Sequence, residues 1–117
     1  MNTRKRGAEY ERQAAEFLKS RGYEILEYNF RSPYGEIDLV ARQDNCLVFV
    51  EVKYRKSAQC GGAAFAVGTE KQRRLSRTAV FYCVRRGIAE DAPCRFDVVA
   101  VTGTEFTHYE NAFDFRR

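Results

Sequence analysis

The stretch "EIDLVARQDNCLVFVEVKYR", residues 36–55, constrains the fold more than any other part of the chain. It contains two runs rich in aliphatic and β-branched residues, which we expect to form strands over residues 36–42 and 46–54. The polar residues 43–45 between them are typical of a turn, so the two strands should pair as a hairpin. This hairpin is apolar enough to form the centre of a domain, yet it contains Asp38, Glu51 and Lys53.

The segments around the hairpin predict the rest of the fold. The remaining elements are expected at residues 5–21 (helix), 23–31 (strand), 69–87 (helix), 94–101 (strand) and 105–109 (strand). Gly22 should end the first helix, and Thr69 with Gln72 fits a capping box that opens the second. The glycine-rich residues 56–68 are expected to form a mobile loop. The sequence thus predicts a single α/β domain over residues 1–117, with a mixed sheet of about five strands flanked by helices in the order α-β-β-β-α-β-β.

Strand alternation assigns the hairpin side chains to faces. Glu36, Asp38 and Val40 should share one face of their strand, and Ile37, Leu39 and Ala41 the other. On the next strand, Glu51 and Lys53 should share a face with Leu47 and Phe49. A turn centred on residue 44 would place Asp38 opposite about Val50 and diagonal to Glu51, ~7–8 Å away.

Two carboxylates at that separation can bind one divalent cation between them. Carboxylate oxygens are the ligands that Mg²⁺ prefers, and Lys53 on the same face could contact a water molecule or a phosphate. Metal, water and cation are what phosphodiester hydrolysis requires. The alternative is that Glu51 and Lys53 form an ordinary ion pair on a half-exposed strand.

Two further polar residues are candidates for the same site. Glu9 lies beside the apolar stripe of the first helix, which comprises Tyr10, Ala14, Phe17 and Leu18. It could add a ligand for the metal or for water, or it could be a solvated glutamate. Gln72 has helical spacing with apolar residues of the second helix and should project inward to orient a group of the site, a role compatible with capping.

Basic residues are concentrated in the second helix. Residues 71–86 contain six basic residues and no acidic one: Lys71, Arg73, Arg74, Arg77, Arg85 and Arg86. Lys53, Arg55 and Lys56 precede them. One-sided positive charge favours a polyanionic partner, although a solvated helix face would have the same composition.

Composition narrows the class of protein. The chain has no apolar run that approaches the ~20 residues of a membrane span, and its charged first residues show no secretory signal. The four cysteines form no CxxC pair, so a structural zinc site is not expected. Free thiols then suit a reducing compartment, and we expect a cytoplasmic protein that does not bind membranes.

Four blocks together resemble the bacterial YraN-like family of small proteins: "GEIDLVARQDNCLVFVEVKYR", "EKQRRLSRTAVFYC", "RFDVVAV" and "HYENAF". The resemblance spans nearly the whole chain. That family is regarded as a group of predicted endonucleases with the restriction-endonuclease-like fold, similar to archaeal Holliday-junction resolvases. Its PD-(D/E)XK signature matches Asp38, followed by Glu51, Val52 and Lys53, with Ile37 in place of the proline. The helix glutamate of the resolvase-like branch would be Glu9.

The resemblance implies a Mg²⁺- or Mn²⁺-dependent endonuclease that cleaves DNA, with branched or structured DNA as substrate. Asp38, Glu51 and the carbonyl of Val52 would hold the metal, and Lys53 would position the water. The residues expected to contact phosphates are Lys56, Lys71, Arg73, Arg74 and Arg77. A homodimer is implied by resemblance alone. The main alternative is a nucleic-acid-binding or scaffolding module that keeps the fold without turnover, and a further one is a protein-interaction domain.

Overall fold

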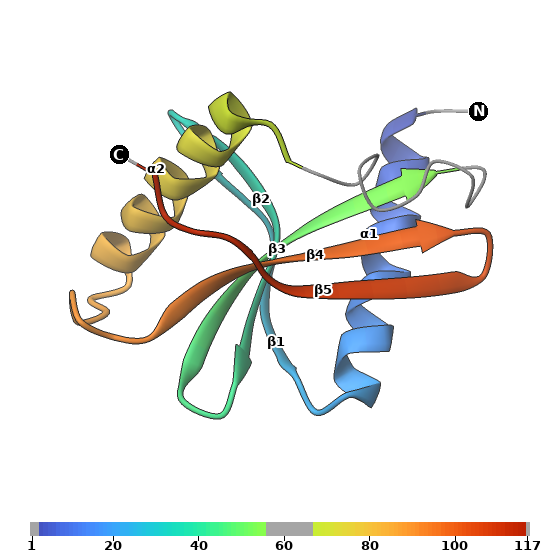
Figure 1. Ribbon diagram of the computed structural model, residues 1–117, viewed down its shortest axis with the longest axis horizontal. Helices are drawn as coiled ribbons and strands as arrows, with labels where there is room; N and C mark the ends of the chain where they lie inside the picture. The colour runs from blue at the N-terminus through green and yellow to red at the C-terminus, as the bar shows by residue number, and fades with distance from the viewer. Residues whose placement is uncertain (1–2, 56–66, 117) are drawn as a thin grey trace.

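A computed structural model describes residues 3–55 and 67–116 of the chain (Figure 1). Its elements are α1 (Thr3–Ser20), β1 (Glu24–Ser32), β2 (Gly35–Gln43), β3 (Cys46–Arg55), α2 (Thr69–Arg85), β4 (Cys94–Thr102) and β5 (Glu105–Phe113). The predicted order α-β-β-β-α-β-β is confirmed. Most of the expected loop, including Lys56, lies outside the described residues.

The five strands form one mixed sheet in the order β1-β2-β3-β4-β5. Neighbouring strands are antiparallel except β3 and β4, which are parallel and have α2 between them in sequence. The predicted mixed sheet of about five strands is confirmed, and the E-x-K segment lies on its central strand.

Two apolar clusters cover opposite faces of the sheet, one under each helix. The α1 cluster includes Ala14, Ala15, Leu18, Leu39, Ala41, Val48, Val50, Val99 and Val101. The α2 cluster includes Ile37, Val40, Leu47, Phe49, Leu75, Ala79, Tyr82, Phe96 and Val98. In Figure 1 the two helices are well separated, with the strands running between them. Burial of both faces explains why β3 is almost continuously apolar up to Glu51.

The two helices end close to the predicted glycines, and α2 begins at the predicted Thr69 but without the predicted cap. Gly22, with a φ of 89°, ends α1 in a Schellman motif, in which the Tyr23 N–H donates to the Leu18 carbonyl at 3.0 Å. The capping box predicted for Thr69 and Gln72 is wrong, because the N-cap of α2 is Gly68 and no side chain caps it. No helix in the described part of the chain is long and apolar enough to cross a membrane.

Side-chain alternation in β2 breaks at Asp38. Ile37 packs in the α2 cluster whereas Leu39 packs in the α1 cluster, so the prediction that these two share a face is wrong. Strand β1 is also irregular opposite Asp38. Tyr28 pairs with Leu39 and Phe30 with Ile37, and Asn29 between them has a φ of 53°. Asn tolerates this left-handed conformation better than most residues do. The two strands are therefore distorted together where Asp38 lies.

Strand β5 is longer than predicted, extending to Phe113. Its pairing with β4 shifts between Phe96 and Val98, and the fully buried Asp97 lies at the shift. The Asp97 carboxylate accepts hydrogen bonds from the Asn111 N–H at 2.9 Å and from His108 Nε2 at 2.7 Å. A salt bridge from Arg95 completes its set of partners. These contacts compensate the buried charge and hold the end of β5 on the sheet.

Candidate functional site

The candidate site lies where β2 and β3 stop pairing. The last pair on this side of the hairpin is Leu39 with Val50, one residue out of step with the predicted register. The next residues along the two strands are Asp38 and Glu51. Instead of a strand carbonyl, the Asp38 carboxylate accepts the Val52 N–H, with 2.8 Å between Oδ2 and N. The side chain thus replaces a backbone acceptor at the point where the strands separate.

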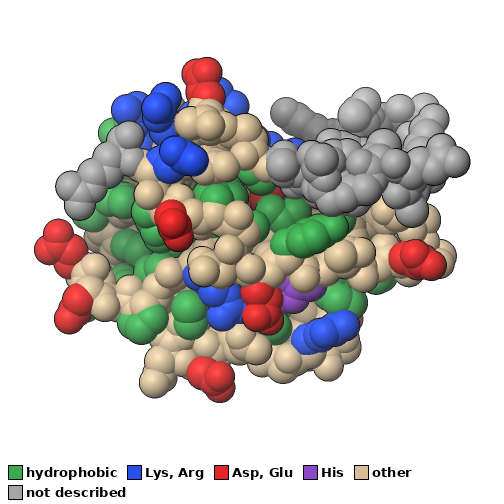
Figure 2. Space-filling model, viewed as in Figure 1, with side chains coloured by type: hydrophobic (Ala, Val, Ile, Leu, Met, Phe, Trp, Pro, Cys, Tyr) green, Lys and Arg blue, Asp and Glu red, His purple; other side chains and the backbone are tan. Residues whose placement is uncertain are grey.

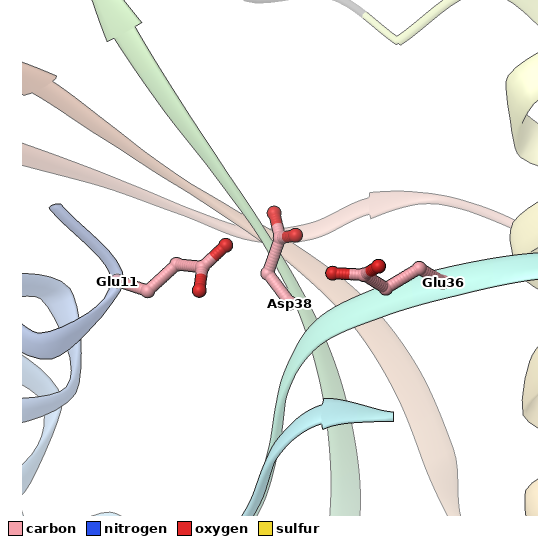
Figure 3. A group of neighbouring side chains, drawn as sticks. All are labelled: Glu11, Glu36 and Asp38. Atoms are coloured by element: carbon pink, nitrogen blue, oxygen red, sulfur yellow. The ribbon is translucent and has the colours of Figure 1, made fainter. Parts of the chain in front are cut away.

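Three carboxylates from two elements meet at this point. Glu11 comes from α1, and Glu36 and Asp38 come from β2, each offering an oxygen within 4.8 Å of the others. Figure 3 shows Asp38 between the other two side chains, with Glu11 and Glu36 pointing toward it from opposite sides. Glu36 also pairs with Arg31, at 3.1 Å. Such a group of hard oxygen donors can hold a divalent cation.

Glu51 joins this group from β3. Its side chain is only 5% exposed, and it is hydrogen-bonded to the Asp38 carboxyl. On the other side, the Lys71 ammonium of α2 forms an ion pair with Glu51 Oε2. The pair expected from the sequence, Asp38 and Glu51, is thus brought together.

The crowding of acids changes their protonation. Burial, together with the hydrogen bond and negative charge of Glu51, raises the pKa of Asp38 to about 9, and the Val52 N–H opposes this only in part. Burial also raises the pKa of Glu11, opposed by hydrogen bonds to Asn29 and Asp38. The Asp38 carboxyl group therefore retains a proton at neutral pH in the metal-free protein.

Helix α1 contributes Glu11 to the site rather than Glu9. The carboxylate of Glu9 is 47% exposed and contacts Arg12 at 2.6 Å and Gln13 at 3.1 Å on its own helix. These contacts lower the pKa of Glu9. Glu9 is thus placed as a helix-surface glutamate, the alternative already evident from its sequence pattern.

The other predicted catalytic residues are placed as follows. Lys53 is half-buried on β3, two residues beyond Glu51, and pairs with Ala100 of β4. Gln72 directs its amide nitrogen to the Val67 carbonyl at 2.6 Å and accepts from Arg116 Nε at 2.5 Å. Gln72 thereby joins the start of α2 to the C-terminal segment.

The basic residues of α2 divide into two sets. Arg73, Arg74 and Arg77 are exposed, and Arg74 has a long contact of 3.8 Å with Glu70. Figure 2 shows Lys and Arg side chains gathered over this helix, at the upper left. Lys71 instead reaches the buried Glu51. Arg73, Arg74 and Arg77 are thus exposed on the helix surface, whereas Lys71 contacts a buried acid.

The sequence analysis did not predict that Glu11 and Glu36 belong to the site, or that Lys71 contacts Glu51. A signal for Glu11 was present, since Glu11, Ala14, Ala15 and Leu18 have the spacing i, i+3, i+4 and i+7. The last three are completely buried, so Glu11 lies along the face of α1 that meets the sheet. Glu36 was assigned to the face of Asp38 without a role. No local pattern indicates that Lys71 pairs with Glu51.

Comparison with known proteins identifies the family. A family model described as "Uncharacterised protein family UPF0102" matches residues 10–101. A UPF0102 protein of Lachnoclostridium phytofermentans is 45% identical over 97% of each chain, and one of Nitrosomonas europaea is 45% identical over 93% of each. One of Caldicellulosiruptor saccharolyticus is 48% identical over 86% of this chain and 85% of its own. These matches confirm the YraN-like resemblance: the chain belongs to the uncharacterised protein family UPF0102.

Proposed function

We propose that the protein is a metal-dependent endonuclease that hydrolyses phosphodiester bonds of DNA. The observation that carries the proposal is the convergence of Glu11, Glu36 and Asp38, with ligand oxygens within 4.8 Å of one another, beside the buried Glu51. Acids are costly to gather unless a cation compensates them. The resemblance to the PD-(D/E)XK signature supports the same chemistry.

The donor set fits Mg²⁺ or Mn²⁺. All its side-chain ligands are carboxylates, which hard divalent cations prefer, and the buried Glu51 already holds a cation, the Lys71 ammonium, at Oε2. Asp38 and Glu51 would hold the ion together with the Val52 carbonyl, and Glu11 would take the ligand role that the sequence had suggested for Glu9. When bound, the ion would supply positive charge against the scissile phosphate and favour deprotonation of a water.

The remaining polar residues would act around this centre. Lys53, on the strand that carries Glu51, would hold the attacking water or stabilise charge on the phosphate. The Val52 N–H keeps the Asp38 carboxylate oriented. Gln72 would act indirectly, by fixing the first turn of α2 through Val67 and Arg116.

The α2 surface would bind the substrate. Exposed Arg73, Arg74 and Arg77 can each pair with a phosphate oxygen, with Lys71 and Lys56 as the further contacts that the sequence indicated. Similarity to resolvases favours branched or structured DNA and a homodimer as the working form. The free thiols of Cys46, Cys83 and Cys94 support a cytoplasmic location.

Calorimetric titration with Mg²⁺ or Mn²⁺ tests the proposal, using wild type and Asp38→Asn. We expect wild type to bind the ion and the variant to bind it at least tenfold more weakly, since Asp38 is the central ligand. DNA affinity that is independent of metal and equal in both proteins, with no ion bound, would instead favour a binding or scaffolding module. Negligible DNA affinity even at low salt would favour a protein-interaction domain.

A further inference from the structure

Lys71 is placed differently from the other cations of α2. It lies in the first turn of the helix, and its side chain is 43% exposed while the Glu51 carboxylate that it contacts is 5% exposed. The ammonium thus reaches from a solvent-facing helix down to a buried acid. Arg73, two residues further along, remains exposed.

A buried carboxylate requires a compensating charge, and Lys71 supplies one where a metal ion is also expected. Removing the partner of a buried acid is strongly destabilising. Two cations next to the same carboxylate repel each other, however, so a bound divalent ion and the Lys71 ammonium would compete for Glu51.

The Lys71 ammonium can move away from Glu51 at little cost. Lysine is a point charge on a flexible four-carbon stem, and its half-exposed position allows the ammonium to move into water without repacking the core.

We infer that Lys71 is the internal counter-ion of Glu51 in the metal-free protein and that a divalent cation displaces it on binding. This inference rests on the proposed function, because it assigns a competitor to the metal of that same site. Lys71 is thus a positioning residue: it holds the Glu51 side chain in place in the metal-free protein, and it weakens the apparent affinity for the metal.

The test compares Lys71→Met with Arg73→Met. Each variant removes one positive charge from the same turn of α2, but only the first removes the contact with Glu51. Mn²⁺ affinity is measured by calorimetry at one fixed pH, and the melting temperature is measured without metal. We expect Lys71→Met to bind Mn²⁺ roughly tenfold more tightly than Arg73→Met, and to melt at a lower temperature without metal.

A second variant keeps the test decisive if Lys71→Met does not fold. Lys71→Arg retains the charge and adds a planar fork that can bind the carboxylate at two points, so it should bind Mn²⁺ several-fold more weakly than wild type.

The outcomes separate the two ideas. If wild type binds Mn²⁺ but Lys71→Met binds it no more tightly than Arg73→Met does, the counter-ion role is refuted and the metal site stands. Weaker binding in Lys71→Met also refutes displacement, because Lys71 would then assist the metal. If none of the proteins, wild type included, binds Mn²⁺, the proposed function fails together with this inference.

Discussion

The backbone N–H of Val52 donates a 2.8 Å hydrogen bond to Asp38 Oδ2. Val52 separates Glu51 from Lys53 on β3, whereas Asp38 lies on β2 just beyond the last pair of the two strands. The bond therefore joins Asp38 to the segment of β3 that carries Glu51 and Lys53. The bond holds the two strands together beyond Leu39 and Val50, where the backbone hydrogen bonds between β2 and β3 have ended.

Replacing Asp38 with Asn should stabilise the metal-free protein at alkaline pH. The pKa of Asp38 is raised to about 9 in the folded state, above the ordinary value of 3.8. The folded protein then binds more protons than the unfolded chain between these values, so wild-type stability falls as pH rises from about 4 through about 9. Asp38→Asn removes this loss and should be more stable at pH 8 by on the order of 2 kcal/mol.

The measurement is urea unfolding in EDTA across pH 5–9. Asp44→Asn is the matched control, because Asp44 is an exposed turn residue on the same hairpin. The control should follow the pH dependence of wild type. An Asp38→Asn protein whose stability falls as steeply with pH as that of wild type would show that Asp38 does not hold the proton.

Glu9 and Glu11, in the middle of α1, should differ in their effect on metal binding. Glu11→Gln removes an acid next to Asp38 and should weaken Mn²⁺ binding by roughly tenfold or more, within the range known for ligand-shell changes. Glu9→Gln removes an exposed acid that pairs with Arg12 and should change the affinity less than twofold. Calorimetry of both variants measures this, and equal losses would mean that only overall charge matters.

The exposed arginines of α2 should set the salt dependence of DNA binding. Arg73→Ala and Arg77→Ala should each lower the slope of log K against log[salt] by roughly 0.9, the value for one lost contact with a duplex phosphate. Lys19→Ala, on the surface of α1, is the control and should leave the slope unchanged. Fluorescence anisotropy over a salt series gives the slopes. If all three slopes equal that of wild type, DNA does not bind on α2.

Asp97 should be needed for stability rather than for metal binding. Burial alone would raise its pKa, but hydrogen bonds from His108 and Arg95 lower it below the ordinary value. Asp97→Asn leaves Arg95 without its buried partner and should destabilise the fold by about 2–4 kcal/mol, as judged from urea unfolding at pH 7. In wild type this contribution should be lost as pH falls below about 4. Mn²⁺ affinity of the folded variant should stay at the wild-type value, and a large loss would place Asp97 in the site.

The fold could be predicted from the sequence because its signals are local. The run of β-branched and aromatic residues in β3, the apolar stripe of α1 and the glycine that ends α1 can each be recognised from neighbouring residues. The extension of β5 could not be predicted in this way. It depends on Asp97 accepting the Asn111 N–H across two strands, a contact that no short pattern encodes.

The two strand residues at the centre of the candidate site could be predicted from the sequence, and the helix residues could not. Asp38 and Glu51 lie on paired strands, so the position of the turn between these strands was almost enough to predict that the two side chains are close. The register was out by one residue, and the break in alternation at Asp38 depends on the distortion at Asn29 of β1. Glu11 and Lys71 reach the site from helices, whose rotation and tilt over a sheet are set by tertiary packing.

Cleavage of DNA in the presence of Mg²⁺ tests the central claim most directly. A panel of junction, flap, single-stranded and linear DNA should be incubated with wild type and with Lys53→Ala. We expect wild type to cut at least one branched substrate, to stop when EDTA is added, and to lose roughly a hundredfold in rate or more in the variant. Cleavage that is insensitive to EDTA and equal in both proteins, or no cleavage of any substrate, would contradict the account.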